Sequence, residues 1–179
     1  EPYGGEILHL SVSTTTMLTA TLALGGLIGF AWASRVLSRG QDAYRMASWG
    51  AWVGLPAFVA VIASAPLASP VLFALGIFLI GLGGGLFAHG TLTATMQLAP
   101  REHIGLAMGA WGAVQATAAG VGMAAGGLVR DGVALGSSSV LGYSAVYGLE
   151  ILLLALTLWA MAPMMRPAHP SVRMSPNSA

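Results

Sequence analysis

The sequence contains no lysine and no cysteine, and it has few charged residues of any kind. Only 7% of its 179 residues are charged, whereas a soluble domain usually carries about 25%. Without cysteine there can be no disulfide, no thiolate metal site and no cysteine nucleophile. All seven basic residues are arginines scattered along the chain, which argues against a nucleic-acid partner.

Catalytic motifs are missing as well. The chain has no glycine loop followed by lysine, no Ser/His/Asp arrangement and no paired carboxylates. The glycine run at 83–85 lies in the middle of an apolar stretch, so it is not a phosphate-binding loop. We therefore do not expect an enzyme.

Hydrophobic residues, by contrast, make up 56% of the chain, and the mean hydropathy is +0.78. Such a chain cannot cover a water-facing surface, so we expect an all-α, polytopic membrane protein whose solvent is largely the lipid bilayer. Charged loops and a break with two prolines at 64–70 divide it into five spans. We expect these spans near residues 12–34, 46–65, 71–97, 104–128 and 143–164, as a bundle covering 11–165.

Three further segments complete this division of the chain. Residues 1–10 are expected to be the outer-side end of a preceding helix or loop. A longer loop is expected over 130–139, where Arg130 and Asp131 are followed by a serine run. Residues 166–179 are rich in proline and serine, which predicts a disordered tail.

The arginines predict an orientation. Six of them lie in the first loop, the third loop and the tail, all on one side, whereas Arg130 is alone on the other. Positive charge favours the cytoplasm, so this side and the C-terminus are expected to be cytoplasmic. The first span then enters from the outer side, so an earlier helix must have crossed before it. We therefore interpret the chain as part of a longer protein that lacks its N-terminal half.

Glycine pairs at four-residue spacing occur in four of the five spans. Such pairs let helix backbones approach closely in lipid, either in static packing, which we favour, or in seams that slide in a transporter. The fifth span lacks them and is rich in leucine, so we expect it to be the most lipid-facing. The pairs are Gly25/Gly29, Gly50/Gly54, Gly81/Gly85, Gly105/Gly109 and Gly122/Gly126.

His89 is an ionisable residue at membrane depth, where such groups are costly and often functional. A helical side chain leans over the preceding turn, and here that turn is Gly85, so we expect a bare patch with room for a large flat ligand. A neutral imidazole could be an axial ligand to the metal of a macrocycle, bacteriochlorophyll magnesium or haem iron. The alternative is a histidine bonded to a backbone carbonyl or to Thr93.

Glu150 is the second such residue, in the outer half of the fifth span, and Tyr147 and Tyr143 share its helix face. Its carboxyl could carry a proton in a coupled transporter, with a pKa raised by burial. It could equally be a structural group bonded to tyrosine near the interface.

Several stretches of the chain resemble the PucC/LhaA family, the bacteriochlorophyll-delivery members of the major facilitator superfamily. The most specific are EPYGGE at 1–6 and GGGLFAHG at 83–90, followed by GAWGAVQAT at 109–117 and the pair Arg130-Asp131. Tyr147 to Glu150 also fits a Tyr/Phe-x-x-Glu pattern of the family. The resemblance covers nearly the whole chain up to about residue 163.

This resemblance implies that the five spans correspond to helices eight to twelve of a twelve-helix facilitator protein, with residues 1–6 at the outer end of helix seven. It also implies an assembly factor for light-harvesting antenna complexes, in the bacterial inner membrane, specifically an intracytoplasmic photosynthetic membrane. Such a factor would bind bacteriochlorophyll near His89 and Gly85, with Glu150 and Tyr147 as further candidates, and present it to antenna polypeptides. The reaction-centre complex is a second candidate partner. Facilitators often carry an Asp-Arg loop after the eighth helix, but Ser34 stands here where the aspartate belongs.

Two other functions stay open at this point. A secondary active transporter of the facilitator type would use Glu150 and the glycine seams as working parts. A structural accessory subunit of a photosynthetic complex would occupy a place in the membrane without delivering anything.

Overall fold

The computed structural model describes residues 2–165. Over this range the chain is helical and contains no β-strand, and five of its helices are long and apolar enough to cross a membrane, as expected. The bounds are α1 (Pro2–Glu6), α2 (Val12–Leu37), α3 (Ala43–Ser64), α4 (Pro70–Leu98), α5 (Ile104–Gly136) and α6 (Ser139–Met161), with 3-10 turns at Arg101–His103 and Ala162–Met165. The expected tail at 166–179 lies outside the described residues.

Most of the long helices begin at a polar cap that the sequence supplies. The side chains of Ser11, Asp42, Ser69 and Ser138 each accept a hydrogen bond from the backbone N–H three residues on. Such caps satisfy N–H groups that have no partner within the helix. Proline at the first position of α4 adds a preset backbone angle, so the break at 64–70 lies where it was predicted.

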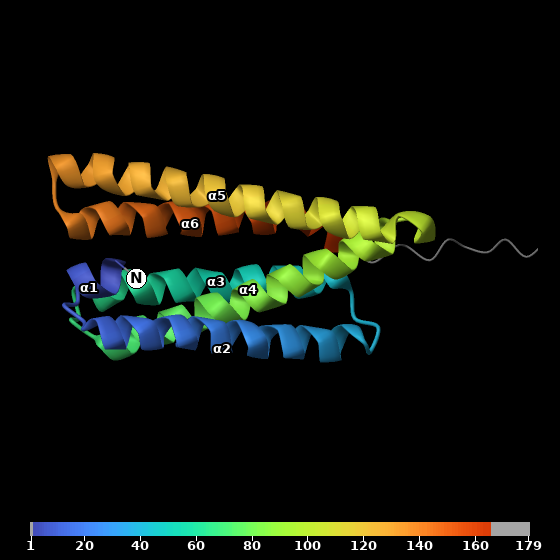
Figure 1. Cartoon of the computed structure of the whole chain (residues 1–179), viewed down its shortest axis with the longest axis horizontal. Coiled ribbons are helices and arrows are strands. Elements are labelled where there is room, and N and C mark those ends of the chain that lie inside the picture. Colours follow the sequence, from blue (N-terminus) through green and yellow to red (C-terminus); the bar gives the residue numbers. More distant parts are fainter. Residues whose placement is uncertain (1, 166–179) are drawn as a thin grey trace, which may run out of the picture.

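The five long helices run up and down the bundle in alternating directions (Figure 1). One end, which we call the α1 end, holds α1 and the connections at 65–69 and 137–138. The opposite end, which we call the arginine end, holds the connections at 38–42 and 99–103. Four arginines therefore gather at one end of the bundle, as the loop assignment predicted: Arg35, Arg39, Arg45 and Arg101.

Helices α2, α3 and α4 pack into what we call the packed unit, with α4 lying against both of the others. Its glycines lie where two backbones touch. A methyl group added at Gly25 would collide with the carbonyl oxygen of Phe78, and one at Gly81 with that of Leu22. On the α3 side, a methyl group at Gly50 would lie 2.5 Å from the carbonyl oxygen of Gly83. The glycine pairs of these helices are therefore sites of close static packing.

Helices α5 and α6 form a hairpin that lies beside this unit (Figure 1). Helix α6 packs on α3, and α5 approaches α4 at the arginine end, where the indole N–H of Trp111 donates a hydrogen bond to the hydroxyl oxygen of Thr91 at 3.2 Å. Close approach within the hairpin occurs near its turn, where a methyl group at Gly142 would lie 2.6 Å from the carbonyl oxygen of Arg130.

One expectation about this hairpin is wrong. The segment 130–136 is not a loop: α5 continues to Gly136, because Val133, Ala134 and Leu135 prolong the apolar helix and no proline interrupts it. The connection is only 137–138. Helix α5 has no buried residue, whereas α6 buries Gly142, Tyr143 and Met161, and the expectation that the fifth span is the most lipid-facing stays a prediction.

Candidate functional site: a cleft around Glu150

The candidate site lies on the face of α6 that carries Glu150, partly between α6 and α5 and partly between α6 and the packed unit. Glu150 is half-buried and lines two neighbouring cavities, which also share Ala118 of α5. One carboxyl group therefore lies where the two cavities meet. We call these two cavities together the Glu150 cleft.

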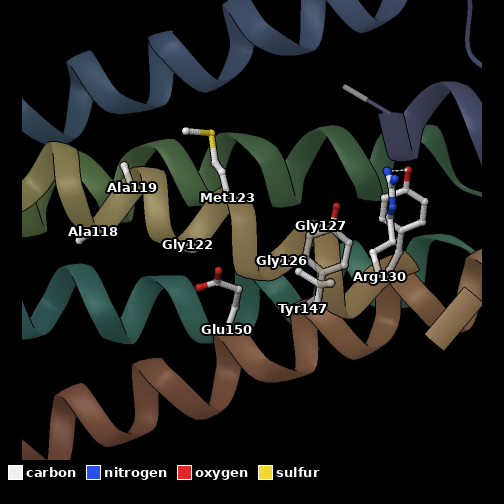
Figure 2. A pocket seen from close by; sticks show the side chains of 11 residues that line it. Ala118, Ala119, Gly122, Met123, Gly126, Gly127, Arg130, Tyr147 and Glu150 are labelled. Atoms are coloured by element: carbon white, nitrogen blue, oxygen red, sulfur yellow. Dashed lines mark hydrogen bonds between the residues drawn. The ribbon is translucent and has the colours of Figure 1, made fainter. Parts of the chain in front are cut away.

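The first cavity lies between α5 and α6 and has a volume of about 540 Å³. Its α5 wall consists mainly of small residues and is therefore nearly flat. A methyl group added at Gly122 or Gly127 would have no neighbouring atom within 4 Å. Figure 2 shows Glu150 and Tyr147 projecting from α6 toward this wall, with Arg130 at the end nearest α1. The wall residues are Ala118, Ala119, Gly122, Met123, Gly126 and Gly127.

The second cavity extends from Glu150 toward α3 and α4 and has a volume of about 450 Å³. Glycines of the packed unit form one wall, and Phe58 and Phe87 supply aromatic surface. Thr157, one of its polar lining groups, bonds its hydroxyl to the carbonyl of Leu153 in its own helix. The cleft is thus largely apolar, and Glu150 is its ionisable residue at membrane depth.

The tyrosines of α6 connect the cleft with α1. The ring of Tyr147 lies 6.0 Å from that of Phe58 and meets that of Tyr3 edge-on at 5.6 Å between centroids. Tyr143 meets Tyr3 in the same way at 5.2 Å. Tyr147, Glu150 and Tyr143 all line the first cavity, so the sequence correctly grouped these three residues.

His89 and Gly85 have surroundings different from those expected. A methyl group at Gly85 would collide with the carbonyl oxygen of Gly26, so the backbone of α2 fills the space expected for a flat ligand. The His89 ring packs edge-on against Phe30, with centroids 4.5 Å apart. Its Nδ1 atom is buried and has no hydrogen-bond partner among residues 2–165, so the alternative of a Nδ1 bond to a carbonyl or to Thr93 is not formed. A role of His89 in pigment binding stays a prediction.

A polar cluster at the α1 end closes off one side of the cleft. The Tyr143 hydroxyl donates a hydrogen bond to a carboxylate oxygen of Glu6 at 2.9 Å and accepts one from Arg130 Nη1 at 3.3 Å. The Arg130 guanidinium also pairs with Asp131 at 2.6 Å. Hydrogen bonds from Ser139 and Tyr143 lower the pKa of Glu6 below its ordinary value, because they stabilise the carboxylate.

The sequence indicated the members of this cluster only separately. Glu6 belongs to the EPYGGE stretch and Arg130 to the Arg-Asp pair, both noted for a family resemblance, but nothing in their spacing brings them together. Their contact depends on α5 continuing to Gly136, which the loop prediction missed. Within the described part of the chain, no group of three or more His, Asp or Glu residues could hold a metal ion.

The fold and the cleft define a class: a polytopic α-helical membrane protein with an apolar, carboxyl-bearing cleft between two groups of helices. The family description "PUCC protein" matches residues 1–169, and the chain belongs to this family.

Curated relatives agree with this assignment. Over 150 residues the chain is 56% identical to Protein PucC of Rhodovulum sulfidophilum, a match that covers 84% of this chain and 33% of the relative. It is 53% identical to Protein PucC of Cereibacter sphaeroides over 173 residues, which are 94% of this chain and 38% of that protein. A protein of Rhodobacter capsulatus from the puhA-bchM intergenic region is 49% identical over 176 residues, covering 93% and 37%. The chain thus spans little more than a third of the length of these relatives, and no solved structure matches it.

Proposed function

We propose that this chain is part of an assembly factor for bacterial light-harvesting antenna complexes, which holds bacteriochlorophyll in the membrane and passes it to antenna polypeptides. Membership of the PucC family supports the general role. The observation that carries the finer proposal is the Glu150 cleft, an apolar space at membrane depth with a wall of small residues and one carboxyl group.

The chemistry of this cleft suits a flat, amphiphilic cargo. Apart from Met123, the wall consists of alanine and glycine, which carry no long side chains, and the ring of Tyr147 faces the same space. A carboxyl group is a hydrogen-bonding group in this otherwise apolar part of the cleft, and in its protonated form it donates a hydrogen bond to a carbonyl group. Bacteriochlorophyll carries carbonyl groups at the edge of its macrocycle, so Glu150 would orient it there. In this proposal the cleft takes the place of His89 and Gly85 as the principal pigment site.

The test is the pigment content of the protein purified gently from membranes of a bacteriochlorophyll-producing host. Gly122→Leu places a side chain in the first cavity at a position with open space, so the variant should fold. We expect it to lose most of the bound pigment, measured as bacteriochlorophyll absorption per protein. Gly120→Leu is the matched control, because it also has open space and does not line the cavity.

The outcomes separate the two pigment sites. If Gly122→Leu keeps its pigment and His89→Leu loses it, then the pigment binds at His89 and the assignment to the cleft is wrong. If the unaltered protein carries no bacteriochlorophyll, then the delivery proposal fails as a whole.

A second candidate function, proton-coupled transport of an amphiphile, is favoured by the position of Glu150 at the junction of two cavities. The same carboxyl could carry a proton between them. Transport requires a flux in proteoliposomes that Glu150→Gln changes. The serine at position 34, in place of a facilitator aspartate, counts against this function.

A further inference from the structure

The polar cluster at the α1 end joins three segments that are far apart in the sequence. Glu6 lies on α1, Arg130 on α5 and Tyr143 on α6, and the tyrosine hydroxyl bonds to both of the charged groups. The Arg130 guanidinium also lies over the Tyr143 ring, 5.4 Å from its centroid. A single side chain on α6 is therefore held by a carboxylate on one side and a cation on the other.

Helix α1 is in turn fastened to the packed unit. The Tyr3 hydroxyl donates a hydrogen bond to the carbonyl oxygen of Val61 at 3.1 Å and lies 3.2 Å from the Ser64 hydroxyl oxygen. The Tyr3 ring packs on Phe73 of α4, with centroids 5.0 Å apart, and is only 3% exposed. The contact between Glu6 and Tyr143 thus ties the hairpin to the packed unit through α1.

The same side chains separate two cavities. A cavity of about 490 Å³ at the α1 end is lined by Glu6, Asp131 and Ser139 together with Arg130 and Tyr143. Arg130 and Tyr143 also line the first cavity of the Glu150 cleft. Of the polar cluster, Arg130 and Tyr143 therefore lie between the cavity at the α1 end and the first cavity of the Glu150 cleft.

We propose that Glu6, Tyr143 and Arg130 form a latch that shuts the Glu150 cleft off from the α1 end and admits cargo when it opens. We call it the α1-end latch. The nature of the cargo rests on the proposed function, but the latch follows from the contacts alone. Polar contacts of this kind hold a closed state and are still weak enough for binding to shift the equilibrium. Because the pKa of Glu6 is lowered by its hydroxyl partners, its carboxylate is ionised and available for this contact at neutral pH.

The absence of cysteine makes the latch directly testable. Val146→Cys places a thiol in the first cavity, where Val146 is half-buried and lies opposite Gly126. A water-soluble maleimide added to the detergent-purified protein reports whether this position can be reached. We expect Tyr143→Phe to speed labelling on the order of tenfold, because the phenyl ring keeps the contacts with Tyr3 but loses both hydrogen bonds.

A second variant and two controls keep the test decisive. Glu6→Ala changes an exposed side chain, so the variant should fold, and it should speed labelling in the same way. The double variant should label no faster than Tyr143→Phe alone, because that change already removes the hydrogen bond between Tyr143 and Glu6. Leu67→Cys, 66% exposed at the same end, should label at one rate in all backgrounds, and Tyr44→Phe on α3 should leave Val146→Cys unaffected.

Unchanged labelling of Val146→Cys in both latch variants overturns the proposal, and so does a double variant that labels clearly faster than Tyr143→Phe alone. The labelling result does not depend on pigment. If the variants label faster but the protein carries no bacteriochlorophyll, the latch stands and the proposed function fails. If the protein carries bacteriochlorophyll but labelling is unchanged, the proposed function stands and the latch fails.

Discussion

The packed unit and the hairpin use the same residue type, glycine, in opposite ways. In α2, α3 and α4, most glycines touch the backbone of a neighbouring helix, so that even a methyl group would collide. In α5, methyl groups at Gly105, Gly109 and Gly112 would meet nothing within 4 Å. Glycine spacing in a span therefore does not by itself indicate a helix contact. A glycine pair permits two helices to approach closely, but the approach occurs only where a neighbouring helix packs against it.

This difference gives the two regions different roles in the proposed function. The packed unit buries small residues such as Ala33, Ala47 and Ala51 completely and forms one wall of the cleft. The hairpin carries Glu150, packs on α3 through α6, and is also joined to the unit at the α1 end through Tyr3 and the latch. In the proposed function the hairpin is the part that moves when cargo binds, and three predictions test the contrast between the two regions.

The largest effect is expected from alanine at glycines of the two regions. Gly81→Ala forces a methyl group against the carbonyl of Leu22, and overpacking of this kind costs about 2–3 kcal/mol. Gly109→Ala meets no neighbour and gains helix propensity, so its effect should be between zero and a stabilisation of about 1 kcal/mol. Thermal unfolding of the purified protein in detergent, followed by tryptophan fluorescence, measures both. Equal effects at the two positions would remove the contrast between the regions.

A smaller effect is expected at the junction of the regions. Tyr3→Phe keeps the ring packed on Phe73 but loses the hydrogen bond to the carbonyl of Val61. The loss should be about 1 kcal/mol of stability, since the Ser64 hydroxyl already bonds to the same carbonyl at 2.6 Å. The same unfolding assay checks it, with Tyr44→Phe on α3 as the control. A protein as stable as the unaltered one would mean that α1 is not fastened by this bond.

The smallest effect concerns pH. The pKa of Glu6 is lowered by the hydroxyls of Ser139 and Tyr143, and the charged neighbours that face it are Arg130 and Asp131. A lowered folded-state pKa stabilises the protein above the ordinary value of 4.5, and this stability is lost as the pH falls through the lowered value.

We therefore expect the unfolding temperature to fall between pH 5 and pH 3 more steeply in the unaltered protein than in Glu6→Gln. Other carboxylates contribute equally to both curves, so the difference between the curves isolates Glu6. Parallel curves would show that the carboxylate makes no such contact.

Much of the fold could be predicted because its signals are local. Charge-free stretches marked the five spans, and caps such as Asp42 and Ser69 start their helices where the polar residues lie. The prediction of a loop at 130–136 is wrong because the charges of Arg130 and Asp131 are typical of a loop in a membrane protein. Their charges are instead paired with each other on a helix, and Arg130 also bonds Tyr143. For the site, the i, i+3 spacing of Tyr147 and Glu150 correctly predicted a shared face, since that depends on helix geometry alone.

The sequence by itself determined three properties of the chain. It is a membrane protein, its helices begin at particular polar residues, and its arginines gather at one end of the bundle. These properties follow from hydropathy and capping, which act within one helix or one loop. Only the tertiary structure decided that α2 covers Gly85, that Glu150 faces a cleft between two groups of helices, and that Glu6 meets Tyr143 across 137 positions of sequence. Those facts depend on which helix lies against which, and in a membrane that choice is made by close packing and polar pairing between helices.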